Sequence, residues 1–141
     1  MKVHIGPYRA NRKIDVRIDK YDTWNMDYTL SLIVHPMLVQ LKANKHGAPL
    51  VDMQDRPEHL RTEEVDEHGL DIYHFDAWNW VLDEMIWAFG LKAKESDALD
   101  ACHDKCDTYG DELCQVCLKE TQDHMNRAFG LFGKYYECLW D

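Results

Sequence analysis

Two pairs of cysteines carry the most specific chemical signal in this sequence. Cys102 and Cys106 are four residues apart, and Cys114 and Cys117 are three apart. At both spacings two side chains share one face of a helix, so a helical hairpin can bring four thiols together. Four thiolates would hold a structural zinc ion in a closed tetrahedral site. The same cysteines can also remain free thiols or form two disulfides, and their spacing matches no well-known zinc module.

A second group of chemically capable residues lies on the segment 75–90. Asp83 and Glu84 occupy the middle of a predicted helix, between Trp80 and Trp87. Carboxylates in apolar surroundings can have raised pKa values and act as acid, base or metal ligand. The simpler interpretation is that each pairs with a Lys or Arg side chain or reaches solvent. The pair supports the hypothesis of a metal-dependent hydrolase, although no spacing such as His-Glu-x-x-His accompanies it.

Aromatic residues suggest a third kind of site. Trp24, Trp80, Trp87 and Tyr135 could form stacking walls for a nucleotide base, and Arg127 could meet its phosphate. Packing in the core explains the same aromatic residues. The candidate ligand-binding residues are Trp80, Asp83, Glu84, Trp87 and Arg127, and the candidate metal ligands are Cys102, Cys106, Cys114 and Cys117.

The overall charge argues against one class of partner. The chain holds 26 acidic and 16 basic residues, a formal net charge of −10 at pH 7. Negative charge repels nucleic-acid phosphates unless basic residues cluster, and the cluster at residues 9–13 is weak. We therefore expect no direct contact with nucleic acid.

Localisation and reaction class are constrained by what the sequence lacks. No apolar run approaches the ~20 residues that a membrane-spanning helix needs, and residues 1–6 show no secretory signal. These features predict a cytoplasmic protein that does not enter the membrane. The serine-hydrolase, P-loop and dinucleotide motifs are absent, so no common enzyme class is indicated.

A helix over residues 76–91 is the element around which the others are expected to pack. Its apolar residues recur at three-and-four spacing, as in an amphipathic helix, at Trp78, Val81, Leu82, Met85, Ile86 and Phe89. Trp80 and Trp87 form a second stripe, which indicates packing from both sides. That stripe could instead be the seam of a symmetric homodimer.

The remaining elements are predicted from alternation, turn residues and caps. Residues 1–20 read as a β-hairpin, and because two strands alone are marginally stable, this hairpin should lean on the helices. Residues 25–45 predict a helix that Pro36 kinks or divides in two. Residues 48–74 predict an acidic surface loop with one helical turn at 57–61.

The C-terminal part, residues 97–139, is expected to form a cysteine-bearing helical hairpin and a final helix from about 112 to 139. The main apolar face of that helix is predicted at Leu118, Met125, Phe129, Phe132, Tyr136 and Leu139, and a flanking apolar face at Leu131, Tyr135 and Cys138. Gly130 and Gly133 lower its helix propensity by about 1 kcal/mol each relative to alanine. Glycine at that cost suggests a close backbone approach at both positions.

Several segments resemble a family of small uncharacterised proteins from tailed bacteriophages, especially large-genome and marine ones. The resemblance lies in residues 1–8, 26–30, 45–49 and 80–89, in Leu131-Phe132-Gly133-Lys134-Tyr135-Tyr136 and in Leu139-Trp140-Asp141. It covers the predicted hairpin, the three long helices and the C-terminus. The resemblance implies a bacteriophage origin but no activity. The cysteine cluster departs from the family pattern, which favours a local staple over a zinc function shared by the family.

Together these features predict a single mainly α domain over 1–141, with three long helices packed around a central helix and a small N-terminal β-hairpin. The expected function is that of a non-enzymatic bacteriophage accessory protein in the cytoplasm of the infected host cell. Its expected partner is a host protein or a small nucleotide-like ligand. The alternatives are a metal-dependent hydrolase using Asp83 and Glu84, and a minor virion component.

Overall fold

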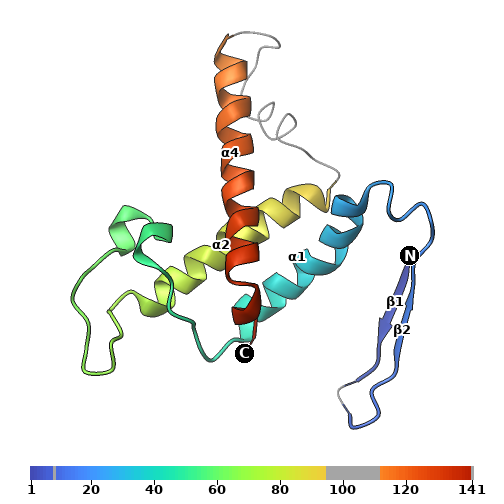
Figure 1. Ribbon diagram of the computed structural model, residues 1–141, viewed down its shortest axis with the longest axis horizontal. Helices are drawn as coiled ribbons and strands as arrows, with labels where there is room; N and C mark the ends of the chain where they lie inside the picture. The colour runs from blue at the N-terminus through green and yellow to red at the C-terminus, as the bar shows by residue number, and fades with distance from the viewer. Residues whose placement is uncertain (8, 95–111, 141) are drawn as a thin grey trace.

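The fold is mainly helical, with a two-stranded antiparallel hairpin at the N-terminus, as expected. The computed structural model describes residues 1–7, 9–94 and 112–140. Its strands are β1 (Lys2–Ile5) and β2 (Ile14–Arg17), and its α-helices are α1 (Met26–Asn44), α2 (His74–Lys92) and α4 (Glu112–Lys134) (Figure 1). Short 3-10 helices are η1 (Met53–Asp55), η2 (Glu58–Leu60) and η3 (Tyr136–Cys138). The predicted first helix of the cysteine-bearing hairpin, residues 97–106, lies outside the described residues.

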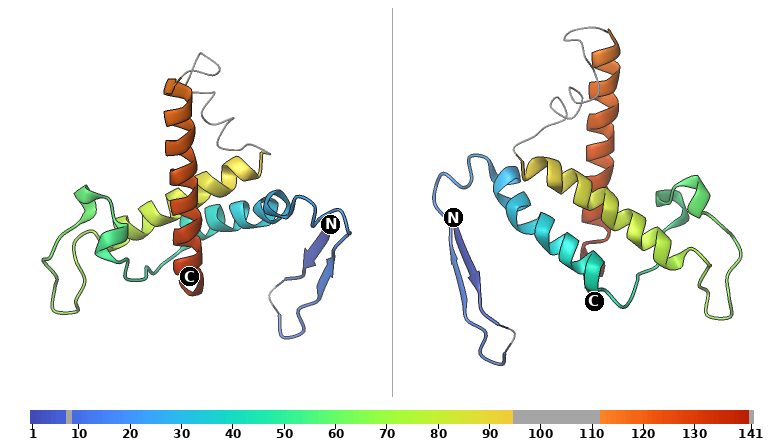
Figure 2. Two further views of the ribbon diagram at one scale, coloured as in Figure 1. Left: turned by 45° about the horizontal axis from the view of Figure 1, so that its top comes forward. Right: turned by 180° about the vertical axis from the view of Figure 1, so that it is seen from behind.

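Helix α2 contacts both of the other long helices. Helix α1 lies beside it, whereas α4 crosses it and extends beyond it (Figures 1 and 2). The predicted core stripe is confirmed at Trp78, Val81, Leu82 and Met85, which are fully buried, and at Phe89, which is buried; Ile86 is only partly buried. This stripe therefore supplies much of the apolar surface whose removal from water stabilises the fold.

Helix α1 is continuous through Pro36, so of the two predicted alternatives the division into two helices is wrong, and the kink stays a prediction. At Gly90 of α2, an added Cβ would lie 3.1 Å from Nε2 of His35 in α1. Gly130 and Gly133, in contrast, have open space where a Cβ would be. The close approach expected at these two glycines is therefore wrong, and of these three helical glycines it is Gly90 at which an added Cβ would meet a neighbouring side chain tightly.

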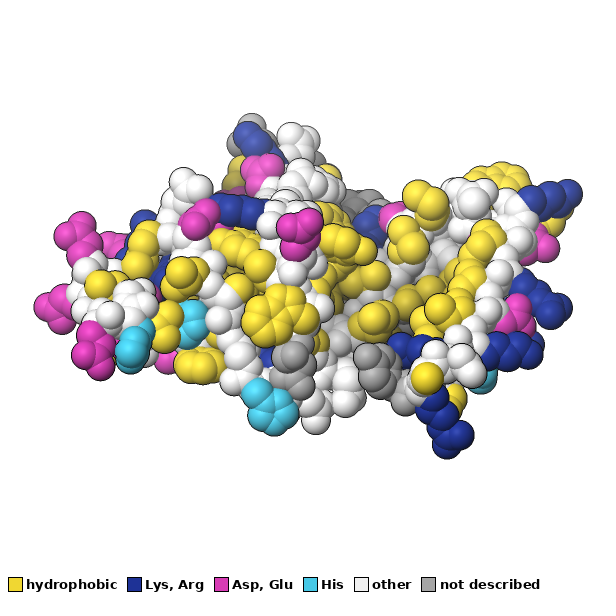
Figure 3. All heavy atoms as spheres, turned by 60° about the horizontal axis from the view of Figure 1, so that its bottom comes forward, with side chains coloured by type: hydrophobic (Ala, Val, Ile, Leu, Met, Phe, Trp, Pro, Cys, Tyr) yellow, Lys and Arg dark blue, Asp and Glu magenta, His cyan; other side chains and the backbone are white. Residues whose placement is uncertain are grey.

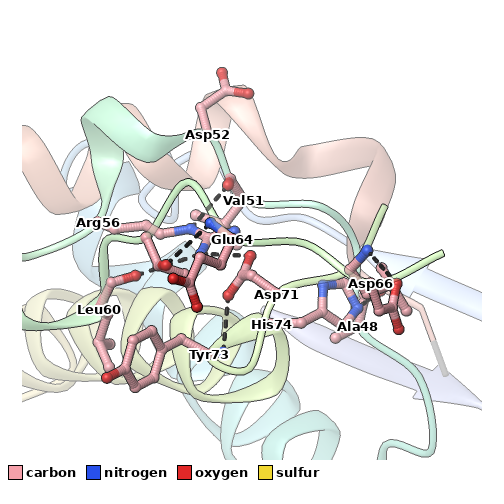
Figure 4. A network of polar contacts seen from close by, with 12 residues as sticks. Ala48, Val51, Asp52, Arg56, Leu60, Glu64, Asp66, Asp71, Tyr73 and His74 are labelled. Carbon is pink, nitrogen blue, oxygen red and sulfur yellow. Dashed lines mark hydrogen bonds and ion pairs between the residues drawn. The ribbon is translucent and has the colours of Figure 1, made fainter. Parts of the chain in front are cut away.

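The segment 48–74 is more than an acidic surface loop. Arg56 donates from Nη1 to Asp71 Oδ2 over 2.9 Å, and the two side chains are only 1% and 2% exposed (Figure 4). Arg56 also donates from Nε to the carbonyl of Val51 over 3.0 Å. The helical turn predicted at 57–61 is confirmed as η2, with Pro57 just before it. The prediction missed the buried pair because polarity alone predicts exposure, and only the fold brings these two partners together.

Helix α4 ends at Lys134, five residues before the predicted end. The next residue, Tyr135, is buried with its ring edge-on to Trp78, and its hydroxyl donates to Asp55 Oδ2 over 2.7 Å. The buried face of α4 comprises Thr121, Met125, Ala128 and Leu131. It confirms Met125 of the predicted main face and Leu131 of the predicted flanking face, whereas Tyr136 is exposed. Packing against α2 therefore rotates the helix toward its smaller side chains.

The β-hairpin stands away from the helices, contrary to the expectation that it leans on them (Figures 1 and 2). Its register pairs Val3 with Val16 and Ile5 with Ile14, so these four side chains share one face. All four are exposed. The Met1 ammonium group pairs with Asp22 Oδ1 at 2.9 Å and ties the base of the hairpin to the segment that precedes α1.

Candidate functional site

The two candidate carboxylates of α2 face different helices. Asp83 is exposed and pairs with Lys42 of α1. Glu84 accepts a hydrogen bond from His124 Nε2 of α4 over 2.7 Å, and Arg127 Nη2 lies 3.8 Å from the same carboxylate oxygen. The two carboxylates therefore serve separate contacts and do not converge on one ligand.

A compact polar cluster forms where α2 meets α4, and it contains three of the five predicted residues. Trp87 stacks on the imidazole of His124, with ring centroids 3.9 Å apart and planes inclined by 14°. His124 in turn holds Glu84, and Arg127 lies beside it with its side chain largely exposed. We call Glu84, Trp87, His124 and Arg127 the α2–α4 cluster. Its exposed cation is the group with which an anion can interact.

His124 is the member of this cluster that the sequence analysis missed. It lies three residues before Arg127 on a predicted helix, a spacing that puts both side chains on one face. From this spacing alone, His124 could have been predicted to lie beside Arg127. The stacking of His124 on Trp87 could not have been predicted from the sequence, because it depends on how α4 crosses α2.

The other aromatic candidates do not form one wall. Trp80 is partly buried and packs against the core. Trp24 is exposed and stacks on Tyr21, at a centroid distance of 6.3 Å, in the segment before α1. Tyr135 packs on Trp78 inside the core. The imidazole of His124 also covers one face of Trp87, so a base could stack on that face only if His124 moved.

A second polar cluster joins the segment after α1 to the end of α4. Lys134 Nζ lies 2.5 Å from Asp52 Oδ2 and 2.6 Å from Asp55 Oδ2. Tyr135 donates its hydroxyl hydrogen to Asp55 and accepts the backbone N–H of Asp52 over 3.0 Å. Burial, followed by the hydrogen bond to Asp55, raises the pKa of Tyr135 to about 12. The tyrosine therefore remains a neutral donor at neutral pH, and the cluster holds the segment after α1 against the end of α4.

The four cysteine candidates are only partly described. Cys102 and Cys106 lie outside the described residues, and Cys114 lies in α4 with its side chain outside them. Cys117 is half-buried on α4. Within residues 1–7, 9–94 and 112–140, no group of three or more His, Cys, Asp or Glu side chains could hold a metal ion. The zinc hypothesis therefore stays a prediction.

An apolar groove lies between the C-terminal half of α1 and the C-terminal end of the chain, which are side by side in Figures 1 and 2. Its volume is about 860 Å³, within the range of roughly 300–1,000 Å³ typical of ligand pockets. The lining residues are Val34, Pro36, Met37, Leu38, Gln40, Leu41, Phe132, Tyr136, Leu139 and Trp140. None of the predicted site residues is among them.

No protein-family model, curated protein sequence or solved structure matches this chain. The resemblance to bacteriophage proteins therefore rests on its sequence motifs. Among the described helices, none has both the length and the apolar content that crossing a membrane requires.

Proposed function

We propose that this chain is a non-enzymatic bacteriophage accessory protein that binds a host protein in the infected cell, and that the apolar groove is its binding surface. In this proposal, α1 and α4 pack on α2 as one unit, and the groove lies on the surface of that unit. The single observation that carries it is the groove of about 860 Å³, lined almost wholly by apolar side chains. Exposed apolar surface of this kind marks binding sites more often than chance.

The shape and charge of the surroundings indicate what the groove takes. Met37, Tyr136 and Trp140 line it and keep more than half of their surface exposed, so they can anchor apolar side chains of a partner. Residues 21–141 hold ten Lys and Arg against 24 Asp and Glu, so the body that bears the groove is strongly acidic. An amphipathic helix with an apolar face and basic flanking residues fits both features.

Two alternatives receive less support from the geometry. A nucleotide-like ligand at the α2–α4 cluster would have to displace His124 from the face of Trp87 that it covers. A metal-dependent hydrolase would need Asp83 and Glu84 to act together, but they pair with α1 and α4 respectively. A minor virion component remains distinguishable by mass spectrometry of purified particles.

The test compares two tryptophan variants in a pull-down from host lysate. Trp140 lines the groove and is 56% exposed, whereas Trp24 is 84% exposed and does not line it. We expect Trp140→Ala to lose a captured protein that the wild type and Trp24→Ala both retain. The purified captured protein should then bind Trp140→Ala at least about tenfold more weakly, as expected for an aromatic anchor.

Unchanged binding by the groove variants would contradict the proposal. If the captured protein binds Trp140→Ala and Met37→Asp as tightly as it binds the wild type, the groove is not its binding surface. Circular dichroism of each variant checks that the helices are retained.

A further inference from the structure

We propose that two copies of this chain form a symmetric dimer by exchanging their N-terminal hairpins, with the apolar face of each hairpin packed on the exposed side of α1 in the other copy. This inference does not use the α2–α4 cluster and shares only Met37 with the groove, so its test through Val16 and Leu30 is separate from that of the proposed function.

The first observation is an apolar sheet face without cover. Val3, Ile5, Ile14 and Val16 lie on one face of the hairpin, and Ile18 continues that face beyond β2. These five side chains are 38–65% exposed. The opposite face carries Lys2, His4, Asp15 and Arg17. An isolated two-stranded hairpin is marginally stable in water, so an amphipathic one that stands apart needs a surface to cover its apolar face.

The second observation is a helix that is apolar on more than one side. Ser31 and Leu38 of α1 are buried on the side that faces α2. Met26, Leu30 and Met37 are nevertheless exposed, and their spacing of four and seven places them on another stripe of the same helix. A helix that is apolar around its circumference is normally covered on more than one side. This stripe is therefore a second uncovered surface in the same chain.

The two surfaces match in length. The apolar row from Ile14 to Ile18 spans about 13 Å at ~3.3 Å per residue. The stripe from Met26 to Met37 spans about 16 Å at 1.5 Å per residue. One hairpin can therefore lie along one such stripe.

Within one chain the two surfaces remain apart. The ion pair between Met1 and Asp22 and the hydrogen bond from the Asp19 N–H to Asp22 Oδ2, 2.7 Å long, hold the base of the hairpin. Figure 3 shows hydrophobic side chains along the hairpin and over the middle of the helical body, with a hollow between them. A second copy can fill this hollow with its own hairpin while it receives the first.

The charge distribution of the chain favours a second copy as the occupant. Residues 1–20 hold six Lys and Arg against two Asp, a formal charge of +4, and the remaining residues carry −14. Figure 3 shows Lys and Arg side chains along the outer side of the hairpin. A basic hairpin is attracted to the acidic body of another copy, and a two-fold axis makes this attraction twice. The two-fold axis also doubles the contact area, which brings it closer to the ~1,600 Å² of a standard interface.

The experiment measures the mass of the full chain in solution by light scattering after size exclusion, for the wild type and two variants. Val16→Lys puts a charge on the apolar face of the hairpin, and Leu30→Glu puts one on the exposed stripe of α1. We expect a wild-type dimer and an increase of at least tenfold in its dissociation constant for each variant. Two matched controls, His4→Lys on the opposite hairpin face and Ala43→Glu at another exposed position of α1, should remain dimeric.

An equimolar mixture of the two variants distinguishes exchange from other dimers. In a mixed dimer, the intact hairpin of the Leu30→Glu chain meets the intact α1 of the Val16→Lys chain, so one of the two contacts is wild type. We expect the mixture to contain more dimer than either variant alone.

Three results would overturn the proposal. The first is a wild-type monomer at about 100 μM, a concentration at which interfaces of this size associate. The second is a dimer that either variant leaves unchanged. The third is a mixture that contains no more dimer than either variant alone. In that case the apolar face of the hairpin would be covered by another hairpin or by a different protein. Because both substituted residues are exposed, circular dichroism should show unchanged helix content in each variant.

Discussion

At the residue scale, Arg56 and Asp71 form a buried ion pair. Burial opposes ionisation of Asp71, but its hydrogen bond with Arg56 holds the pKa of this carboxyl below its usual range. The other carboxylate oxygen accepts the backbone N–H of Tyr73 over 2.8 Å, just before α2 begins. The pair therefore connects the segment after α1 to the start of α2. Nothing in the spacing of these two residues predicts the contact, because it depends on the path of the intervening loop.

Asp71→Asn should lower the free energy of unfolding by about 3–5 kcal/mol, because it leaves the guanidinium of Arg56 buried without its counter-charge. Asp66→Asn is the matched control, since it makes the same change at an exposed carboxylate of the same segment. We expect that control to change stability by less than about 1 kcal/mol. Urea unfolding followed by circular dichroism measures both. Equal losses in the two variants would mean that the buried pair is not a special stabilising contact.

At the scale of elements, periodicity predicted the core stripe of α2 well and that of α4 less well. Helix α2 is packed by α1 and α4, so its large apolar side chains are buried almost wherever they occur. Helix α4 offers several apolar stripes, and its crossing with α2 selects the one with Ala128 and Thr121. The sequence pattern of α4 alone does not show which of these stripes is buried. The same crossing places His124 against Trp87.

The glycines of the helices should respond in opposite ways to alanine. Gly130→Ala should raise the free energy of unfolding by about 0.5–1 kcal/mol, because the position is helical, exposed and open. Gly90→Ala should lower it, because the new methyl group meets His35 Nε2 at 3.1 Å. Thermal unfolding of both variants measures these changes. In a His35→Ala background the penalty at Gly90 should disappear, and a penalty that persists there would disprove the steric explanation.

At the scale of the whole molecule, three carboxylates with lowered pKa values join segments far apart in the sequence. The hydrogen bond with Lys92 lowers the pKa of Asp27. For Asp55, burial acts in the opposite direction, but Lys134 and Tyr135 bring the pKa below its usual value. Asp71 behaves in the same way with Arg56. These contacts join α1 to α2, the segment after α1 to the end of α4, and the loop 48–74 to the start of α2.

The folded protein should therefore lose stability in acid. A carboxylate whose folded pKa is depressed contributes its full stabilisation above its unfolded pKa, near 4, and loses it as the pH falls through the lower folded value. We expect the free energy of unfolding to be nearly constant from about pH 7 to 5 with respect to these groups, and to decrease steadily below about pH 4. Urea titrations across this range measure it. Asp55→Asn and Asp71→Asn should each flatten the acid limb, and an unchanged slope in both would refute this assignment.

The sequence by itself determined the mainly helical class, the N-terminal hairpin and the core stripe of α2, because each follows from local periodicity and turn chemistry. Only the tertiary structure decided which polar groups meet. It separated Asp83 from Glu84, brought His124 to Trp87, buried Arg56 with Asp71 and formed the groove from α1 and the C-terminal end. The physical reason is that contacts between distant segments depend on how helices cross and how loops return. A local sequence pattern specifies which face of an element is apolar but leaves open which surface will cover it.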